Sequence, residues 1–295
     1  MKKCIFEGCA TALVTPMNSD GSVNFEKLAE IVDSQIKAGV DALVICGTTG
    51  ESATLSSEEH IKVIEAAVKV ADRRVPIIAG TGSNDTEFAL QISKEALAVG
   101  ADALLMVTPY YNKTSQRGLI KHYTYIADNV DAPIILYNVP SRTGVNIKPE
   151  TYFELSKHKN IVAAKEANGD ISALIKTISL CGDNLTIYSG NDDQIVPIMS
   201  LGGKGVISVL SNVIPKETHD ITAACLEGDF KKGKDLAVKY LSLANALFMD
   251  VNPIPVKEAM NLLGLEVGKC RMPLVSMEEK QVSALKKELE NVNLL

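Results

Sequence analysis

The chain has little of several residues and motifs that often identify a protein. Its 295 residues include no tryptophan, four histidines and six cysteines. The cysteines form no C-x-x-C pair and the histidines no H-E-x-x-H pattern, so the sequence predicts neither a zinc site nor another dedicated metal site. Several cysteines lie inside apolar runs, where a free thiol packs as a small hydrophobic group. We therefore expect reduced cysteines and no disulfide framework.

The sequence also lacks the features of membrane, secreted and nucleic-acid-binding proteins. No apolar stretch reaches the roughly 20 residues that a membrane-spanning helix requires. The basic start Met1-Lys2-Lys3 is similar to that of a signal peptide, but Glu7 interrupts the short apolar run behind it. The net charge of −6 argues against a nucleic-acid partner. We therefore expect a cytoplasmic protein that binds neither a membrane nor a nucleic acid.

What the sequence does contain is a regular alternation of short apolar runs with helical patterns. Eight runs are spaced by about 20–35 residues, the length of one strand–helix unit. Each run is apolar throughout, as expected for parallel strands that are covered on both faces. Eight units favour a closed (β/α)8 TIM barrel of the α/β class over an open doubly wound sheet, and no G-x-G-x-x-G supports a dinucleotide-binding half. The runs are Cys9–Val14, Ala42–Cys46, Val75–Ala79, Ala103–Val107, Pro133–Tyr137, Ile161–Ala164, Leu185–Tyr188 and Gly205–Val209.

Local patterns at the helix ends support this alternation. Ser56 and Glu59 form a possible capping box at the start of a helix. The segments Ala38–Leu43 and Val99–Leu104 are similar to each other and lie two strands apart, as equivalent helix-to-strand corners would. Both corners place a glycine directly after the helical pattern, where a left-handed residue often ends a helix.

After about residue 225 the pattern is only helical. We therefore expect a catalytic barrel over residues 1–225 and a C-terminal helical extension over residues 226–295, packed on the barrel. The helices expected in this extension are Phe230–Met249, Val256–Leu263 and Met277–Glu290.

Lys165 carries the clearest indication of chemistry. It directly follows the sixth apolar run, and in a (β/α)8 barrel the active site lies at the carboxyl ends of the strands. Burial disfavours the charged form of a lysine and lowers its pKa, and a neutral amine is a nucleophile toward carbonyl groups. The alternative is an ordinary solvated lysine at a strand end.

Polar segments after the neighbouring runs would meet Lys165 at the same rim of the barrel. The turn Gly47–Glu51 offers hydroxyl and backbone N–H groups that can hold a carboxylate, although these residues also suit an ordinary tight turn. Tyr137 can belong to the site or to the core, and Arg142 can bind a carboxylate or lie in solvent. The joint placement of these residues with Lys165 favours an active site.

Several segments resemble the signature motifs of the dihydrodipicolinate synthase family of class I, pyruvate-dependent aldolases. The matching segments are Gly47–Ser52, Thr108–Asn112, Tyr137–Gly144, Lys165–Ala167, Gly205–Val209 and Asn252–Lys257. The resemblance covers essentially the whole chain. It implies a lyase that condenses pyruvate with L-aspartate 4-semialdehyde to give 4-hydroxy-tetrahydrodipicolinate, in the diaminopimelate and lysine pathway.

The same resemblance implies a role for each site residue. Lys165 would form the imine with pyruvate, and because the iminium is the electron sink, no metal or organic cofactor is implied. Thr48, Tyr137 and a Tyr111 supplied by a neighbouring subunit would relay protons between hydroxyl groups. A shared tyrosine implies a homo-oligomer, expected to be a homotetramer of two tight dimers. The substrate-binding positions would be Thr49 for the pyruvate carboxylate, Arg142 for the semialdehyde carboxylate, and the backbone of Gly190 and Ile207.

Two rival interpretations differ in class. Another pyruvate-dependent aldolase, such as N-acetylneuraminate lyase, would share the glycine-rich turn and the lysine, but such relatives typically lack the Ser-Arg-Thr-Gly segment that contains Arg142. A non-catalytic barrel that senses a metabolite or acts as a scaffold would not need a complete set of lysine, tyrosine and threonine.

The resemblance also predicts a regulatory cleft with an altered composition. Many members of the family bind inhibitory lysine between tight-dimer partners, and the positions that match here are Ser52, Ala53, His60, Asn84 and Tyr110. Ser57 stands where inhibited members often have a second histidine, and Phe88 stands where they place a glutamate. A ligand ammonium that loses its hydration needs an anionic partner, which Phe88 cannot supply. We therefore expect weak or absent inhibition by lysine.

Overall fold

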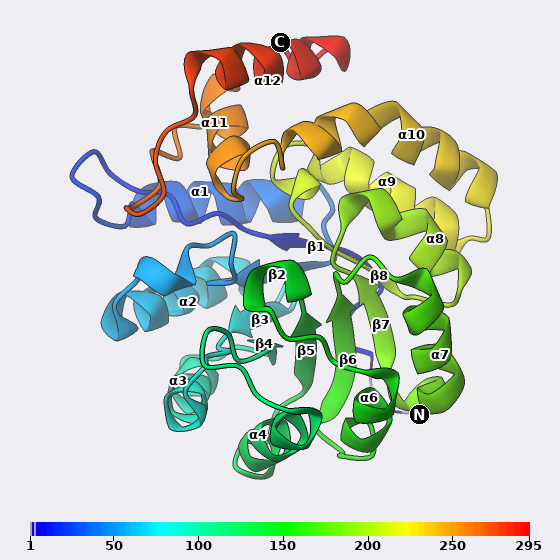
Figure 1. Cartoon of the computed structure of the whole chain (residues 1–295). Helices are drawn as coiled ribbons and strands as arrows, with labels where there is room; N and C mark the ends of the chain where they lie inside the picture. Colours follow the sequence, from blue (N-terminus) through cyan, green and yellow to red (C-terminus); the bar gives the residue numbers. More distant parts are fainter. Residues whose placement is uncertain (1, 3) are drawn as a thin grey trace.

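The computed structural model describes residues 2 and 4–295 and contains a closed barrel of eight parallel strands in sequence order. Helices surround the barrel, which confirms the predicted (β/α)8 architecture (Figure 1). Every predicted run overlaps one strand, and the ends differ by at most two residues. The strands are β1 (Gly8–Ala12), β2 (Ala42–Ile45), β3 (Ile77–Gly80), β4 (Ala103–Val107), β5 (Ile134–Asn138), β6 (Ile161–Glu166), β7 (Thr186–Ser189) and β8 (Gly205–Ser208).

The helices of the barrel follow the strands as predicted. They are α1 (Phe25–Lys37), α2 (Ser57–Ala71), α3 (Thr86–Ala98), α4 (Gln116–Asp128), α5 (Pro140–Thr143), α6 (Pro149–Leu155), α7 (Ile171–Cys181), α8 (Ile195–Ser200) and α9 (Pro215–Leu226). The capping box of α2 is present, because Ser56 accepts a hydrogen bond from the backbone N–H of Glu59 and the Glu59 carboxylate accepts one from that of Ser56.

The two similar corners in the sequence have the same structure. Gly39 and Gly100 both follow a helix with positive φ angles of 92° and 102°, which a residue with a side chain rarely adopts. Two residues later, Asp41 accepts a hydrogen bond from the N–H of Cys9 at 2.7 Å, and Asp102 accepts one from that of Ile77 at 2.8 Å. Each aspartate therefore ties the strand that begins after it to the strand before it.

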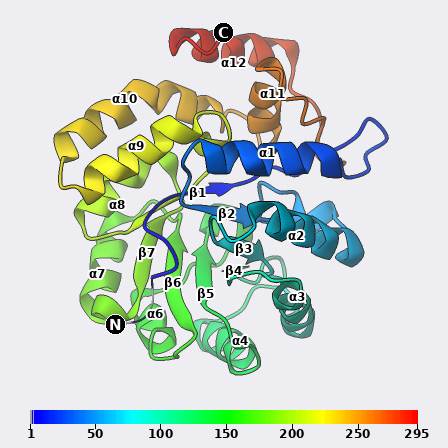
Figure 2. The ribbon, with the colours of Figure 1, turned by 180° about the vertical axis from the view of Figure 1, so that it is seen from behind.

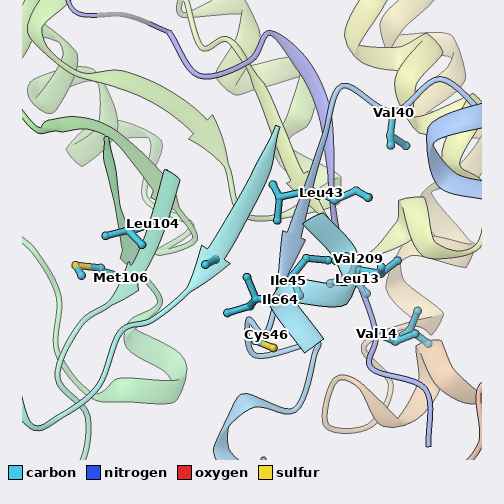
Figure 3. Packing of buried hydrophobic residues seen from close by; sticks show 14 of the residues in the cluster. Leu13, Val14, Val40, Leu43, Ile45, Cys46, Ile64, Leu104, Met106 and Val209 are labelled. Atoms are coloured by element: carbon cyan, nitrogen blue, oxygen red, sulfur yellow. The ribbon is translucent and has the colours of Figure 1, made fainter. Parts of the chain in front are cut away.

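The main apolar core lies between the outer face of the barrel and its helices. Leu43 and Ile45 of β2 and Leu104 and Met106 of β4 point outward, and Ile64 of α2 is buried against this layer (Figure 3). Burial of such side chains supplies most of the free energy that stabilises the fold, at about 25 cal/mol per Å² of apolar surface.

A register shift in β6 determines which of its side chains face the barrel interior. Ile134 pairs with Ile161, but Ile135 pairs with Ala163, so Val162 is the extra residue. Both Val162 and Ala163 therefore belong to the interior cluster, and Ala164 returns to the outer one. Because side chains alternate along a strand, Lys165 then points inward and the next residue outward.

Three further helices follow the barrel: α10 (Phe230–Ala246), α11 (Ile254–Leu262) and α12 (Glu279–Asn291). They correspond to the three helices predicted after residue 225, again with shifted ends. Figures 1 and 2 show α10 beside α9, and α11 and α12 on the same side of the barrel. Among the described residues, no helix combines the length and the apolar character that crossing a bilayer would require.

Candidate active site

Lys165 lies at the carboxyl end of β6 and is only 5% exposed. Its ammonium nitrogen lies 4.3 Å from the centre of the Tyr137 ring, which belongs to the paired strand β5. Burial lowers the pKa of the Lys165 ammonium to about 8; the nearby Arg142 acts in the same direction and Asp192 opposes it. A sizeable fraction of the amine is therefore neutral near neutral pH, as a carbonyl nucleophile must be.

Tyr137 and Thr48 form a pair of hydroxyl groups beside this amine. Tyr137 is 7% exposed, and burial raises the pKa of its phenol, while Arg142 and a hydrogen bond with the Thr48 side chain act against that rise. Thr48 follows β2 and is half-buried. A phenol and an alcohol in contact can pass a proton between them, since each group both donates and accepts.

The closed end of the barrel lies beneath these residues. Phe6 precedes β1 and stacks on Tyr188 of β7 with 4.2 Å between the ring centres. The Tyr188 hydroxyl donates a hydrogen bond to the Phe6 carbonyl oxygen at 2.8 Å. This pair belongs to the interior cluster and packs at the amino-terminal end of the barrel, where Phe6 precedes β1.

Thr49 lies in the turn after β2 and Arg142 in the short helix α5 after β5, and both contact one residue that the sequence interpretation did not select. The Asn252 side-chain nitrogen donates to the Thr49 hydroxyl oxygen at 3.0 Å. The Arg142 guanidinium donates to the Asn252 carbonyl oxygen at 3.1 Å. Thr49 is 3% exposed, whereas Arg142 belongs to the exposed surface. Only the resemblance, through the segment Asn252–Lys257, pointed to this region.

A buried ion pair, also not selected from the sequence, holds the turn of Thr49. Glu51 and Lys257 are almost fully buried and lie 2.8 Å apart. The Lys257 ammonium also donates to the carbonyl oxygens of Thr15 and Lys269, and the N–H of Arg271 donates to Glu51. Helix α11 and the segment after it are therefore attached directly to the glycine-rich turn.

Gly190 and Ile207, whose backbone is predicted to face the substrate, lie just after β7 and within β8. Ile207 is part of the interior cluster on β8. Gly190 follows β7 and packs so closely that a Cβ atom there would lie 2.7 Å from Ala167 and 3.0 Å from the Glu166 carbonyl oxygen. Only glycine lets the two backbones approach in this way.

Tyr111, the remaining residue predicted to be catalytic, lies in the loop between β4 and α4. Its side chain is 90% exposed, and its backbone has a positive φ of 65°. The neighbouring Tyr110 is 38% exposed. A large aromatic side chain that is exposed to this degree is typical of a contact with another chain.

The predicted regulatory residues lie on the turn after β2, at the start of α2, just before α3 and in the loop after β4. His60 is 8% exposed, and its Nε2 atom lies 2.8 Å from the Gly80 carbonyl oxygen. The Asn84 carbonyl oxygen accepts a hydrogen bond from Asn112, in the loop of Tyr110. Ser52 is half-buried, and Ala53 is exposed.

The described residues contain no cluster of side chains that could hold a metal ion. Over residues 2 and 4–295, no three His, Cys, Asp or Glu side chains gather as the ligands of a metal ion would. The titratable groups around the amine are instead Tyr137, Arg142 and Asp192. Asp192 accepts hydrogen bonds from the N–H groups of Val209 and Leu210, at 3.1 and 3.0 Å.

Comparisons with known proteins agree with this geometry. The chain is 55% identical over 292 residues to the 4-hydroxy-tetrahydrodipicolinate synthase of Lachnoclostridium phytofermentans, with 99% of each chain covered. It is 51% identical over 295 residues to that of Acetivibrio thermocellus, with 100% of each covered. The crystal structure of the chloride-inhibited dihydrodipicolinate synthase from Acinetobacter baumannii, complexed with pyruvate, matches with a TM-score of 0.97 and 42% identity over 99% of this chain and 100% of that one. The model of the dihydrodipicolinate synthetase family matches residues 5–292, and the chain belongs to this family.

Proposed function

We propose that Lys165 is the residue through which this enzyme binds pyruvate covalently. The enzyme is a lyase that condenses pyruvate with L-aspartate 4-semialdehyde to give 4-hydroxy-tetrahydrodipicolinate, in lysine and diaminopimelate biosynthesis. The observation that carries the role of Lys165 is its buried amine, with a pKa lowered to about 8, at the carboxyl end of β6. The relative from Acinetobacter baumannii that has pyruvate bound supports the same substrate.

The proposed reaction begins with attack of the neutral Lys165 amine on the keto carbon of pyruvate. Loss of water gives an imine, and loss of a methyl proton then gives an enamine, whose carbon attacks the aldehyde of the second substrate. The amine of that substrate finally adds to the former keto carbon and displaces the lysine, which is ready for another cycle. Tyr137, Thr48 and Tyr111 of the partner subunit would move the protons, and the Lys165 amine lies 4.3 Å from the centre of the Tyr137 ring.

The two carboxylates of the substrates would be held by different side chains of the rim. The buried hydroxyl of Thr49 would hold the pyruvate carboxylate, and the exposed guanidinium of Arg142 would bind the semialdehyde carboxylate with two parallel hydrogen bonds. The backbone of Gly190 and Ile207 would line the space between them.

We also propose a homotetramer built from two tight dimers, because Tyr111 is 90% exposed and would complete the site of a neighbouring chain. As the cellular location we propose the cytoplasm, in keeping with free thiols on all six cysteines. The cleft that contains Ser52, Ala53, His60, Asn84 and Tyr110 would bind lysine weakly or not at all.

A product assay tests the function directly. The purified enzyme is given pyruvate and L-aspartate 4-semialdehyde, and the product is measured through oxidation of a nicotinamide cofactor by the reductase that consumes it. We expect turnover only when both substrates are present, and nearly complete loss in Lys165→Arg, because a guanidinium does not form the imine. Turnover with N-acetylmannosamine in place of the semialdehyde would instead favour the rival lyase.

A further inference from the structure

Asn252 lies between α10 and α11, outside the barrel strands, yet its 5% exposed side chain reaches the rim of the active site. Its amide nitrogen donates to the Thr49 hydroxyl oxygen at 3.0 Å, and its carbonyl oxygen accepts from Arg142 at 3.1 Å. One residue of the C-terminal helical region therefore contacts both side chains that we expect to hold substrate carboxylates, through its side chain on one side and its backbone on the other.

The position of Asn252 is fixed by the buried ion pair nearby. The N–H of Lys257 donates to the carbonyl oxygen of Pro253, the residue next to Asn252. The Lys257 ammonium bonds to Glu51, which is two residues from Thr49 in the same turn. Lys257 is therefore bonded both to the neighbour of Asn252 and to the turn of Thr49, and these contacts hold Asn252 and Thr49 close together.

The direction of this hydrogen bond has a chemical consequence. A threonine hydroxyl has one proton to donate and two lone pairs to accept with. Because the Asn252 amide donates to the Thr49 oxygen, it takes a lone pair and leaves the hydroxyl proton free for another acceptor. A carboxylate of a bound substrate is such an acceptor, and a hydrogen bond to a charged group is stronger than one to a neutral group.

The other side-chain atom of Asn252 indicates that the amide is not there for stability alone. Within the described residues, the Asn252 Oδ1 atom is buried without a hydrogen-bond partner. A buried acceptor without a partner disfavours folding. An asparagine with an unpaired oxygen on a substrate-binding threonine is therefore better explained by the reaction than by packing.

We propose that Asn252 is a positioning residue that orients the Thr49 hydroxyl so that its proton points to the pyruvate carboxylate. This inference rests on the proposed function, in which Thr49 holds that carboxylate. It assigns the C-terminal helical region a part in selecting a 2-oxo acid as the first substrate, in addition to any part in stability.

The substitution Asn252→Asp tests the proposal, because it keeps the shape of the side chain but replaces the donor with a charged acceptor. The Thr49 proton would then bond to the aspartate, so the pyruvate concentration that half-saturates borohydride trapping should rise at least about tenfold. The KM for the semialdehyde should change less than about threefold, because Arg142 contacts the backbone of residue 252 and not its side chain. Asn252→Ala, which only removes the donor, should raise the pyruvate requirement less than Asn252→Asp.

Two controls separate positioning from a structural effect. Asn261→Asp makes the same chemical change in α11, where the Asn261 side chain bonds to Gly268, and should leave the pyruvate requirement unchanged. In a Thr49→Val background, Asn252→Asp should have little further effect on that requirement, since the hydroxyl that it acts through is gone. The proposal would be overturned if Asn252→Asp raised the pyruvate requirement by the same factor in the Thr49→Val background as in the wild type. It would also be overturned if Asn252→Asp raised the requirements for pyruvate and for the semialdehyde equally. Wild-type enzyme that forms no adduct with pyruvate would instead refute the proposed function.

Discussion

At the residue scale, the activity depends on how the surroundings of a few side chains alter their chemistry. Burial lowers the pKa of Lys165 to about 8, so that at pH 7 roughly one amine in ten is neutral before substrate arrives. An ordinary solvated lysine, with a pKa near 10.5, would have far fewer neutral amines. The sequence places Lys165 at a strand end, but only the structure shows that its side chain is buried.

Arg142 should matter for the second substrate much more than for the first. Its guanidinium is exposed at the rim, and we expect it to take no direct part in forming the imine. Replacing Arg142 with alanine should lower kcat/KM for the semialdehyde by about 100-fold or more, in line with the loss of a charge-assisted pair. Adduct formation with pyruvate should change by less than about tenfold. Steady-state kinetics and borohydride trapping measure the two effects separately, and equal losses in both would show that Arg142 supports the loop instead.

The residues found from the sequence and those missed differ in a physical way. Lys165 follows an apolar run directly, and Thr49 and Arg142 lie in the segments that follow two other runs, so the general rule about barrel rims selects them. Asn252 reaches the same rim from a helical region more than 80 residues away from Lys165, and no local pattern marks its contact with Thr49. Contacts between distant segments depend on packing, which a single sequence does not display.

At the scale of the strand, β6 shows that simple alternation does not determine which side chains face the barrel interior. The extra residue Val162 reverses the alternation, so that Lys165 points inward and Glu166 outward. Strict alternation from Ile161 would have placed the amine among the helices. The apolar run in the sequence predicts the strand but contains no mark of this shift, because Val162, Ala163 and Ala164 fit either face.

The outward Glu166 joins the ends of β5 and β6 through a buried network. Its carboxylate accepts hydrogen bonds from the Asn138 side chain at 2.9 Å, the Tyr152 hydroxyl at 2.9 Å and the N–H of Asn168 at 2.9 Å. Burial nevertheless raises the pKa of Glu166 to about 7, against the pull of these donors. The folded protein therefore binds this proton more tightly than the unfolded chain does.

Glu166 should make the stability depend on pH in a defined direction. A raised folded-state pKa means that its contribution is complete below about pH 4.5 and is lost as the pH rises to about 7. Across this window the free energy of unfolding should fall by about 3 kcal/mol more in the wild type than in Glu166→Gln, which does not titrate. Urea unfolding at several pH values, at one protein concentration, measures this difference. Glu154→Gln on the exposed surface is the control, and parallel pH profiles for wild type and Glu166→Gln would contradict the account.

At the scale of the whole molecule, we expect an isolated chain to have an incomplete site, because Tyr111 is 90% exposed and would complete the site of a neighbouring chain. Mixing Tyr111→Phe and Lys165→Arg subunits should restore about one quarter of the wild-type activity. In a random mixture half of the dimers are hybrids, and each hybrid has one site with an intact Lys165 and an intact Tyr111 from the partner subunit. Activity after subunit exchange is the measurement.

A matched mixture provides the control for this experiment. Tyr137 and Lys165 lie in the same barrel, with the amine 4.3 Å from the ring. Tyr137→Phe mixed with Lys165→Arg should therefore remain inactive in every hybrid. Recovery in both mixtures, or in neither, would show that Tyr111 is not shared between subunits.

We expect added lysine to inhibit the enzyme only weakly. Phe88 is 42% exposed in the first turn of α3 and carries no charge for the ligand ammonium. The adjacent Glu87 is hydrogen-bonded to the Tyr125 hydroxyl, and one step along a helix turns a side chain by about 100°. Steady-state rates at saturating pyruvate should therefore hardly change with added lysine, and Phe88→Glu combined with Ser57→His should increase the sensitivity. Micromolar inhibition of the wild type would refute this expectation.

The division of the chain into a barrel over residues 1–225 and an extension over residues 226–295 stays a prediction at this scale. Eight repeated strand–helix units made the barrel predictable, since each unit has the same pattern of local signals. The attachment of the later helices to the glycine-rich turn, through Lys257 and Glu51, was not predictable, because a buried ion pair is set by three-dimensional packing.

The most direct test of the account is to identify the lysine that pyruvate modifies. The enzyme is incubated with pyruvate, reduced with borohydride, digested and analysed by peptide mass spectrometry. The account predicts one stable adduct on Lys165, absent when pyruvate is omitted and absent in Lys165→Arg. An adduct on Lys257 or on any other lysine, with Lys165 unmodified, would contradict it.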